Sequence, residues 1–296
     1  MDKNFEYSEA FCRNLGWVTK EELKRLGSVK VAIGGAGGVG GIHLITLVRL
    51  GITQFHLADP DFFEMKNFNR QYGADMNSLG KNKCDVMLEK ALAINPELKT
   101  KSFKDGITKA NVAEFLDGVD IYVDGIDVFE IETREFLYPE CRKRGIPCVS
   151  VAPVGMGASI VNFTPDSMTF ENYFGVQGKT AMEKIIRFTL GVAPSLVHLK
   201  SLIAREYSNI TERRVSSTPM GCHMASGVMG TEVLKLLLNR GPVTKAPKII
   251  HFDGYTYKVK KTNMFWGHRN PIFKIKLILF KWIASRLPRK LEDSKV

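Results

Sequence analysis

The stretch VKVAIGGAGGVGGIHLITLVRL, residues 29–50, joins an apolar, strand-like segment to an apolar, helix-like segment through a run of glycines. Gly35, Gly37 and Gly40 have the Gly-x-Gly-x-x-Gly spacing, which between a strand and a helix is typical of nucleotide binding. Glycines permit a tight turn and a close backbone approach, and the start of the helix presents free N–H groups to a phosphate. The stretch therefore predicts a phosphate-binding turn in an α/β fold.

The rest of the chain alternates between strand-like and helix-like segments. Strand–helix–strand alternation with short connections predicts a Rossmann-like, doubly wound, mainly parallel sheet, with antiparallel strands added in the C-terminal half. The expected parallel strands are residues 29–35, 54–59, 119–125 and 147–153, and the later strands lie within 158–163 and 248–261. The expected helices are residues 39–51, 80–94, 108–117, 130–144, 180–206 and 222–239.

Composition restricts the class of protein. The chain has 296 residues, of which 44% are hydrophobic and 25% charged, as in an ordinary soluble globular protein. The amino terminus lacks a signal-peptide pattern, and no apolar run reaches the ~20 residues needed to cross a bilayer, so we expect a cytoplasmic protein. Its 5 cysteines are widely spaced without a C-x-x-C pair, so we expect neither a disulfide framework nor zinc.

The glycine turn alone does not distinguish NAD from ATP. Asp59, at the end of the second predicted strand, stands at about the distance expected of an acid that holds a ribose hydroxyl. Residues 58–83 then add a second acid, Asp61, and two permanent cations, Arg70 and Lys83. Two cations behind a nucleotide-binding turn suit a triphosphate, because they complement the charge that develops during nucleotidyl transfer. This pattern favours ATP.

The order of several motifs resembles the ThiF/MoeB/HesA family, the bacterial relatives of ubiquitin-activating enzymes. The glycine turn, G-x-G-G-x-G, is followed by D-x-D, by N-x-N-R-Q and by G-x-x-K. INPEL (94–98) and VDGIDVFEIETR (123–134) continue the likeness, the latter resembling the V-D-x-x-D-N-x-x-x-R segment of that family. The resemblance covers roughly residues 5 to 262, and it implies a fold that binds ATP with Mg²⁺.

The resemblance also implies a role for each matching residue. The turn would lie beside the ATP phosphates, Asp59 would bind the ribose, and Asp127 would hold Mg²⁺, for which one carboxylate is sufficient. The nucleotide-binding set is Gly35, Gly37, Gly38, Gly40, Asp59, Asp61, Asn67, Arg70, Gln71 and Lys83. The catalytic set is Arg70, Lys83, Asp127 and Arg13.

Arg13 does not stand at the position where the family carries its amino-terminal arginine. Members of the family often carry Y-S/N-R-Q near the amino terminus, with an arginine that reaches the ATP of a partner subunit in a homodimer. This chain reads YSEAFCRN (7–14), so Glu9 occupies the literal position and Arg13 comes four residues later. The resemblance implies a homodimer, and whether Arg13 replaces the family's arginine is left open.

Two cysteines raise the question of a thioester or persulfide. Cys222 precedes a predicted helix, where the helix dipole could lower its pKa, and Cys84 directly follows Lys83. We interpret both as small packing residues, so the nucleophile that follows adenylation would come from a partner. The sequence leaves a covalent role for either one open.

We predict a ThiF-like ATP-binding domain over 1–262, with a crossover or insertion at about 164–218 that covers a site. Residues 263–296 form a basic, apolar tail that carries more than half of the net charge of +11. The pattern of the tail fits a strand in FKIKL and a helix in KLILFKWIASRL. Three roles stay open for it: peripheral contact with the inner face of the membrane, packing against the core or a second subunit, and RNA binding.

The favoured function is ATP- and Mg²⁺-dependent adenylation of a carboxylate. The expected substrate is the C-terminus of a small ubiquitin-like or sulfur-carrier protein or of a peptide, which gives an acyl-adenylate and pyrophosphate. A relative of the tRNA threonylcarbamoyladenosine dehydratase is the first alternative. An NAD-dependent oxidoreductase and a non-catalytic binding subunit with the same fold are the others. The sequence does not identify the carboxylate.

Overall fold

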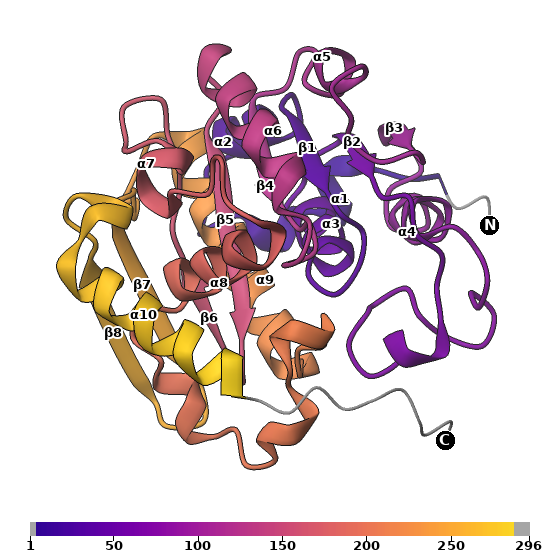
Figure 1. The fold of residues 1–296 in the computed structure, drawn as a ribbon. Helices are drawn as coiled ribbons and strands as arrows, with labels where there is room; N and C mark the ends of the chain where they lie inside the picture. Colours follow the sequence, from indigo (N-terminus) through magenta and orange to yellow (C-terminus); the bar gives the residue numbers. More distant parts are fainter. Residues whose placement is uncertain (1–3, 287–296) are drawn as a thin grey trace.

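The computed structural model describes residues 4–286, and its centre is an 8-stranded sheet with the order β3-β2-β1-β4-β5-β6-β7-β8 (Figure 1). Neighbouring strands are parallel from β3 to β5. The chain winds outward on one side of β1 and then on the other, so the carboxyl ends of β1 and β4 form the switch point where α/β sheets bind ligands. The parallel strands are β1 (Lys30–Gly34), β2 (Gln54–Ala58), β3 (Lys99–Phe103), β4 (Ile121–Asp124) and β5 (Cys148–Val154).

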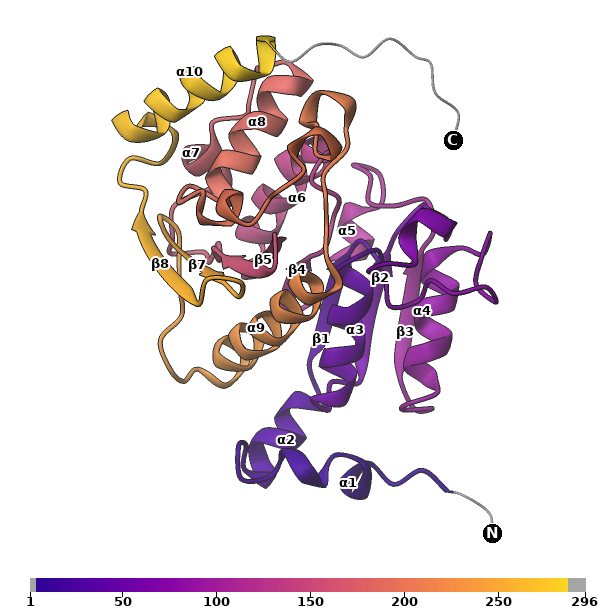
Figure 2. The ribbon, with the colours of Figure 1, turned by 90° about the horizontal axis from the view of Figure 1, so that it is seen from below.

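Helices cover both faces of the sheet, which confirms the predicted Rossmann-like, doubly wound fold. One face carries α3, α4 and α9, and the other carries α5, α6, α7 and α8, with α9 and α8 on opposite sides of the sheet in Figure 2. The first group is α3 (Gly40–Arg49), α4 (Lys83–Leu92) and α9 (Pro219–Leu238). The second group is α5 (Val112–Phe115), α6 (Ile131–Lys143), α7 (Phe170–Phe174) and α8 (Ala181–Val192).

The C-terminal half adds the predicted antiparallel strands. β5 pairs with β6 (Gly157–Ile160), which pairs with β7 (Lys248–Asp253), and β8 (Lys258–Asn263) completes the edge. Lys258, Lys260 and Lys261 are exposed on β8. Lysines on an edge strand discourage pairing with another chain, so this edge is protected by charge.

Two hydrophobic cores hold the layers together. Ile33 and Leu44 belong to the core on the α3 side, and Tyr122 and Phe174 belong to the core on the α6 side. The aromatic side chains of α7, which could have bordered a substrate groove, are buried: Phe170, Tyr173 and Phe174 are at most 5% exposed. Burial therefore favours the packing interpretation of this cluster.

The amino-terminal helices α1 (Tyr7–Ala10) and α2 (Lys20–Leu26) lie beyond the amino end of β1, at the bottom of the view in Figure 2. The Tyr7 hydroxyl donates to the carbonyl oxygen of Gly51 (2.7 Å), just after α3 ends. Thr19 and Glu22 form a capping box that starts α2. The segment thus packs at the end of α3 opposite to the glycine turn.

The end of α8 and the presence of β3 differ from the sequence prediction. The helix expected over 180–206 ends at Val192, because the following Pro194 lacks an N–H and disfavours helical geometry in the residue before it. Three short 3₁₀ turns follow: η3 (Val197–Lys200), η4 (Arg205–Tyr207) and η5 (Ile210–Glu212). β3 was not predicted, because its sequence, KTKSF, buries only Phe103 and has no apolar run.

The tail forms a 3₁₀ turn, η6 (Gly267–Arg269), and a helix, α10 (Pro271–Arg286), so the strand in FKIKL was wrong. α10 packs on α8 and lies outermost on that face of the molecule (Figure 2). None of the helices in the described part of the chain is long and apolar enough to span a membrane. The rest of the predicted tail, residues 287–296, lies outside the described residues.

Candidate functional site

The glycine turn after β1 packs directly against the loop after β4. Gly35 has a φ of +88°, which is strained for residues with a side chain, and its N–H donates to the carbonyl oxygen of Ala58 (2.7 Å). A β-carbon on Gly35 would lie 2.2 Å from the carbonyl oxygen of Gly125, and one on Gly40 would lie 1.8 Å from that of Gly35. Close backbone packing therefore fixes glycine at both positions.

Gly37 and Gly38 lie in the same turn but have space around them. A β-carbon on Gly37 would lie 3.5 Å from Gln71 Nε2, and one on Gly38 would lie 3.5 Å from Cys222 Sγ. Within residues 4–286, the N–H groups of Gly37 and Gly38 have no protein acceptor. They stand at the start of α3, where the helix dipole attracts an anion. The turn thus offers free backbone donors of the kind that a phosphate needs.

Asp59 holds the turn from the end of β2. Its Oδ2 accepts the N–H of Ala36 (2.7 Å), and its Oδ1 accepts the N–H of Asp61 (2.8 Å). Burial raises the pKa of Asp59, while the nearby Lys83 ammonium and these two N–H groups act in the opposite direction. Because Asp59 is only 6% exposed, its contacts in this structure fix the loop, and the predicted ribose contact stays a prediction.

Lys83 begins α4 and turns its ammonium group toward Asp61. The distance from Nζ to Asp61 Oδ2 is 2.8 Å, with the lysine side chain 7% exposed and the aspartate 67% exposed. The helix start is fixed by Asn82, whose side chain accepts the N–H of Cys84 (3.0 Å). An ammonium has three donors, so the pair with Asp61 leaves donors for an anion.

The segment between β2 and α4 brings Arg70 and Gln71 to the glycine turn. Asn67 closes the 3₁₀ turn η2 (Met65–Asn67): its side-chain oxygen accepts a backbone N–H of the same turn, and its carbonyl oxygen accepts the N–H of Gln71 (2.9 Å). A β-carbon on Gly38 would lie 3.7 Å from Arg70 Nε. Within the described residues, the buried Oε1 of Gln71 has no hydrogen-bond partner. Asn67 therefore shapes the 3₁₀ turn η2, and Arg70 and Gln71 face the glycine turn after β1.

Asp127 stands on the other side of the switch point, in the loop after β4. Its Oδ1 accepts the N–H of Phe129 (2.9 Å), and the side chain is exposed. Arg134 fixes the loop by donating from Nη1 to the carbonyl oxygen of Asp127 (2.8 Å) and from Nη2 to that of Ile126 (2.6 Å). The loop is thus held through its backbone, which leaves the Asp127 carboxylate facing solvent.

A buried network under this loop had no role in the sequence analysis. Arg134 forms a bidentate pair with Asp124, at 2.7 Å from Nε to Oδ2 and 3.0 Å from Nη2 to Oδ1, and the Tyr138 hydroxyl donates to the same Oδ2 (2.7 Å). The guanidinium also stacks on the ring of Phe188, 4.5 Å from its centroid. Burial disfavours the charged form, yet the Asp124 carboxylate raises the pKa of Arg134 overall.

The signal for this network was present in VDGIDVFEIETR (123–134), where Asp124 ends a strand and Arg134 follows in the next helix. Spacing alone did not show that the two charges meet below the loop. Arg134 and Tyr138 contact none of the residues predicted to bind the nucleotide. We therefore regard them as positioning residues for Asp127.

The crossover between α8 and α9 contacts both halves of the site. Asn69 Nδ2 donates to the carbonyl oxygen of Ser217 (3.1 Å), next to Arg70. On the other side, Arg213 forms an ion pair with Glu130 (2.7 Å) in the loop after β4. Part of the crossover therefore lies along the carboxyl edge of the sheet.

Both cysteines near the site are buried thiols. Burial raises the pKa of Cys84 to about 12, and its Sγ donates to the carbonyl oxygen of Asp59 (3.5 Å). Burial also raises the pKa of Cys222, although a hydrogen bond to Ser217 and the charge of Arg70 act in the opposite direction. Both groups are protonated at neutral pH, which favours the packing interpretation.

Arg13 is not part of the site within one chain. It is exposed in the 3₁₀ turn η1 (Cys12–Asn14), and the adjacent Asn14 donates to the carbonyl oxygen of Arg49 (3.0 Å), the last residue of α3. The glycine turn lies at the opposite end of this helix, about 15 Å away along its axis. A contribution to the site of a second subunit stays a prediction.

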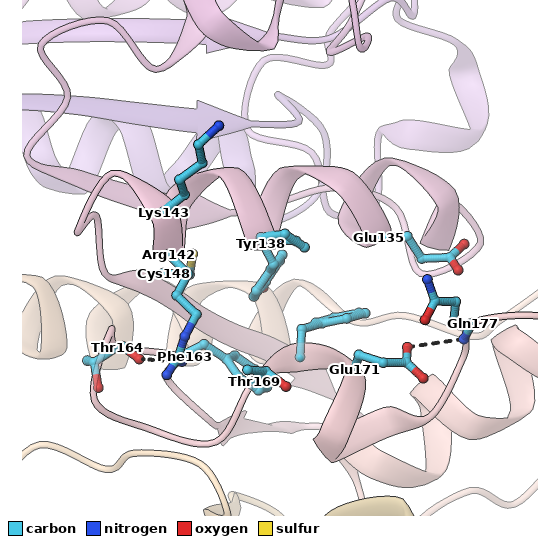
Figure 3. Close-up of a pocket in the computed structure, with 12 residues that line it drawn as sticks. Glu135, Tyr138, Arg142, Lys143, Cys148, Phe163, Thr164, Thr169, Glu171 and Gln177 are labelled. Carbon is cyan, nitrogen blue, oxygen red and sulfur yellow. Dashed lines mark hydrogen bonds between the residues drawn. The ribbon is translucent and has the colours of Figure 1, made fainter.

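A separate hollow of about 610 Å³ lies between α6 and α7 (Figure 3). Its wall includes Tyr138, Phe163 and Phe170. Arg142 also lines it and donates from Nη1 to the carbonyl oxygens of Thr164 and Ser167. None of the residues predicted for the site lines it. This hollow is distinct from the site at the switch point.

The donor set at the switch point fits a nucleotide with a hard cation. Free N–H groups and the cations Arg70 and Lys83 suit phosphates, and the exposed Asp127 offers carboxylate oxygen of the kind that Mg²⁺ prefers. Among residues 4–286, no cluster of three or more His, Cys, Asp or Glu side chains could hold a metal ion by itself. A cation here would depend on ligands from the nucleotide.

Comparison with known proteins agrees with this arrangement. The model of the ThiF family matches residues 11–271. The tRNA threonylcarbamoyladenosine dehydratase of Bacillus subtilis (strain 168) is 35% identical over 150 residues, which are 50% of this chain and 57% of that protein. The SAMP-activating enzyme E1 of Haloferax volcanii is 27% identical over 226 residues, 76% of this chain and 73% of that protein.

The fold is also shared with solved structures. A structure of E. coli MccB with AMPCPP and MccA has a TM-score of 0.66 and 21% identity, and the match covers 88% of this chain and 73% of that one. At this identity the likeness concerns the fold. This chain spans about half the length of the dehydratases that it matches.

Proposed function

Because this chain belongs to the ThiF family, we propose that it activates a carboxylate by ATP-dependent adenylation. The observation that carries the proposal is the convergence of free N–H groups at Gly37 and Gly38, of Arg70 and Lys83, and of an exposed Asp127 at one switch point. An NAD-dependent oxidoreductase has no need for the two cations or for Asp127.

The residues of the site have distinct tasks in this proposal. The N–H groups at the start of α3 hold phosphate oxygens, and Arg70 and Lys83 neutralise the charge that develops on the leaving pyrophosphate. Asp59 fixes the turn and accepts a ribose hydroxyl. Asp127 would hold Mg²⁺, and the ion would supply positive charge that stabilises the phosphates.

The reaction needs little acid–base catalysis. A carboxylate oxygen of the substrate attacks the α-phosphorus, the bond between the α-phosphorus and the bridging oxygen breaks, and pyrophosphate leaves with the electron pair. The nucleophile is already ionised at neutral pH, so the chain contributes mainly position and charge stabilisation. The product is an acyl-adenylate.

Two classes of carboxylate are candidates. The first is the C-terminus of a small protein or peptide, supported by the SAMP-activating relative, of which this chain matches nearly three quarters. The second is the carboxylate of threonylcarbamoyladenosine in tRNA, supported by dehydratases that are 31 to 35% identical to parts of this chain. The net charge of +11 is compatible with binding to tRNA, the substrate of the second class.

ATP–pyrophosphate exchange tests the proposal directly. We expect exchange that depends on Mg²⁺ and on one substrate class, tested with a panel of peptides and Gly-Gly-ending carrier proteins and with modified tRNA. Asp127→Ala should lower exchange by about a thousandfold or more, as loss of charge stabilisation does at active sites. The stability of this variant should be unchanged, because the side chain is exposed.

Glu130→Gln is a control in the same loop, because it also removes the charge of an exposed carboxylate; it gives up an exposed ion pair with Arg213, and such pairs contribute little. Its exchange should stay close to that of the unmodified chain. ATP binding without exchange on any substrate would move the assignment to a non-catalytic subunit, and binding of NADH in place of ATP would refute the proposal.

We also propose that the active form is a homodimer in which Arg13 completes the site of the second subunit. Its exposure at the far end of α3 leaves it available for such a contact. Mixing an Arg13→Ala chain with an Asp127→Ala chain should restore part of the exchange activity that each lacks alone. Unchanged activity of Arg13→Ala by itself would exclude the role.

A further inference from the structure

Helix α10 is apolar on two opposite sides. Its inner side carries Phe273 and Leu277, which are 2% and 6% exposed and belong to the core beside α8. Its outer side carries five large apolar residues that are each more than half exposed. They are Ile272 (64%), Ile275 (58%), Ile278 (67%), Leu279 (54%) and Trp282 (52%).

These five residues, which we call the outer stripe, lie together on the helix surface. With 3.6 residues per turn, they occupy an arc of about 120°. Lys274 and Lys281 border this arc on one side, and Lys276 borders it on the other. α10 lies outermost over α8 (Figure 2), and the exposure of the five residues places the outer stripe on the side of the helix away from α8.

This pattern differs from that of an ordinary surface helix, which is apolar on one face and polar on the other. The protein itself already covers the inner side of α10. A second apolar face of contiguous large residues has no structural use in water, and such patches mark contact with a partner or a membrane. The outer stripe therefore marks a contact surface.

The charges around the stripe favour an anionic surface. α10 contains no Asp or Glu, and of the three lysines that border the stripe, Lys281 also pairs with Glu183 on α8 (3.1 Å) and Lys276 donates to the carbonyl oxygen of Pro194. A second copy of the stripe would bring lysines against lysines. An anionic lipid surface complements them, because lysine ammonium groups reach the headgroups while the apolar side chains enter the acyl boundary.

Tryptophan, which is common at membrane interfaces, occurs within α10 and shortly before it. Trp282 lies within the outer stripe, and Trp266 lies just before η6. Trp266 has a φ of +63°, a left-handed conformation that is uncommon in a bulky residue, and the residue is 70% exposed.

From these observations we propose that α10 lies in the plane of an anionic membrane surface, with the outer stripe inserted at the level of the headgroups. The helix has 16 residues, about 24 Å in length, which is too short to span a bilayer. Contact along its length would hold the enzyme at the membrane without a spanning segment. This surface role is independent of the proposed adenylation.

Vesicle flotation of the full-length chain tests the proposal. We expect the chain to float with vesicles of equimolar phosphatidylcholine and phosphatidylglycerol, and much less with phosphatidylcholine alone. Ile275→Glu, at the centre of the outer stripe, should lower the bound fraction at constant lipid by at least about tenfold, because it places a charge in the acyl boundary. Lys274→Glu and added salt should weaken binding to the anionic vesicles.

Trp17→Glu is the matched control. Trp17 is 83% exposed and belongs to the segment between α1 and α2, two helices that lie at the opposite side of the molecule from α10 in Figure 2. This variant makes the same change of charge and also removes a large exposed apolar residue, and it should float like the unmodified chain.

Three outcomes would overturn the proposal. The first is equal flotation of Ile275→Glu and the unmodified chain. The second is a dimer that dissociates in Ile275→Glu while no flotation occurs, which would assign the stripe to a second copy. The third is tRNA binding that Lys274→Glu abolishes in a chain that does not float.

Discussion

The two loops that meet at the switch point are built by different means. The turn after β1 is shaped by its own backbone, since Gly35 and Gly40 have no room for a β-carbon. The loop after β4 is shaped by side chains from elsewhere, because Arg134 on α6 holds its carbonyl groups and pairs with Asp124 beneath it. The shape of the first loop is thus determined by its own sequence, whereas the shape of the second depends on tertiary contacts.

This difference has a consequence for mutation. In the turn after β1, the cost of a substitution depends on how close the next backbone lies. In the loop after β4, it depends on whether a buried charge keeps its partner. The functional groups themselves, the N–H groups of Gly37 and Gly38 and the carboxylate of Asp127, are the less constrained parts of both loops.

The largest effect on stability should come from Arg134→Leu. The substitution leaves the Asp124 carboxylate, whose side chain is 2% exposed, without its cation, and it frees the loop carbonyls. We expect the free energy of unfolding to fall by about 3–5 kcal/mol. Urea denaturation measures this change.

Asp127→Ala serves as the control for that measurement, because it removes an exposed carboxylate from the same loop and should change stability by less than about 0.5 kcal/mol. Similar losses for the two variants would show that the buried pair does not hold the loop.

Gly40→Ala should have the next largest effect. Its β-carbon would lie 1.8 Å from the carbonyl oxygen of Gly35, so the turn must move, and overpacking of this kind costs about 1–3 kcal/mol. Thermal denaturation reports the loss.

Gly38→Ala provides the comparison within the turn. Its β-carbon would lie 3.5 Å from Cys222 Sγ and 3.7 Å from Arg70 Nε, which are ordinary contacts. We expect stability close to that of the unmodified chain and an affinity for ATP lowered by about tenfold, because the methyl group occupies the side of the turn that faces phosphate. Equal destabilisation by the two alanines would contradict the division of the turn into packing and binding glycines.

A further effect depends on pH and concerns His43, on the helix that the glycine turn starts. Burial lowers the pKa of His43 to about 3, whereas histidine in an unfolded chain titrates near pH 6.5. Between these values, acid protonates the unfolded chain alone, so stability falls as the pH falls. At pH 5 this one group should lower the free energy of unfolding by about 2 kcal/mol relative to pH 8.

His43→Leu should remove that part of the acid sensitivity, as measured by urea denaturation at the two pH values. His223→Leu, at an exposed position of α9, offers the control for the loss of one histidine. An identical pH dependence for His43→Leu and the unmodified chain would exclude this origin of acid sensitivity.

Much of the fold could be predicted from the sequence, because it depends on local patterns. Four of the parallel strands and the antiparallel hairpin follow from apolar runs bounded by turns, and the doubly wound sheet was confirmed. β3 was missed because an edge strand can be polar on both sides, with only Phe103 buried. The end of α8 was missed because the apolar pattern continues past Val192, although Pro194 prevents helix there.

The candidate site was predicted in its residue types but not in its contacts. The sequence by itself determined the glycine turn, since spacing and the absence of side chains are properties of the chain. It did not show that Lys83 pairs with Asp61 or that Cys222 lies beside Gly38. Those contacts join segments far apart in the sequence, and only packing brings them together.

The same division applies to two features beyond the turn. The presentation of Asp127 depends on a buried pair between a strand end and a helix, and the outer stripe of α10 exists only because Phe273 and Leu277 commit the other side of the helix to the core. In the sequence, α10 is simply apolar with lysines. Tertiary structure decides which side of such a helix is buried, because burial depends on the neighbouring helix and not on the order of residues along the chain.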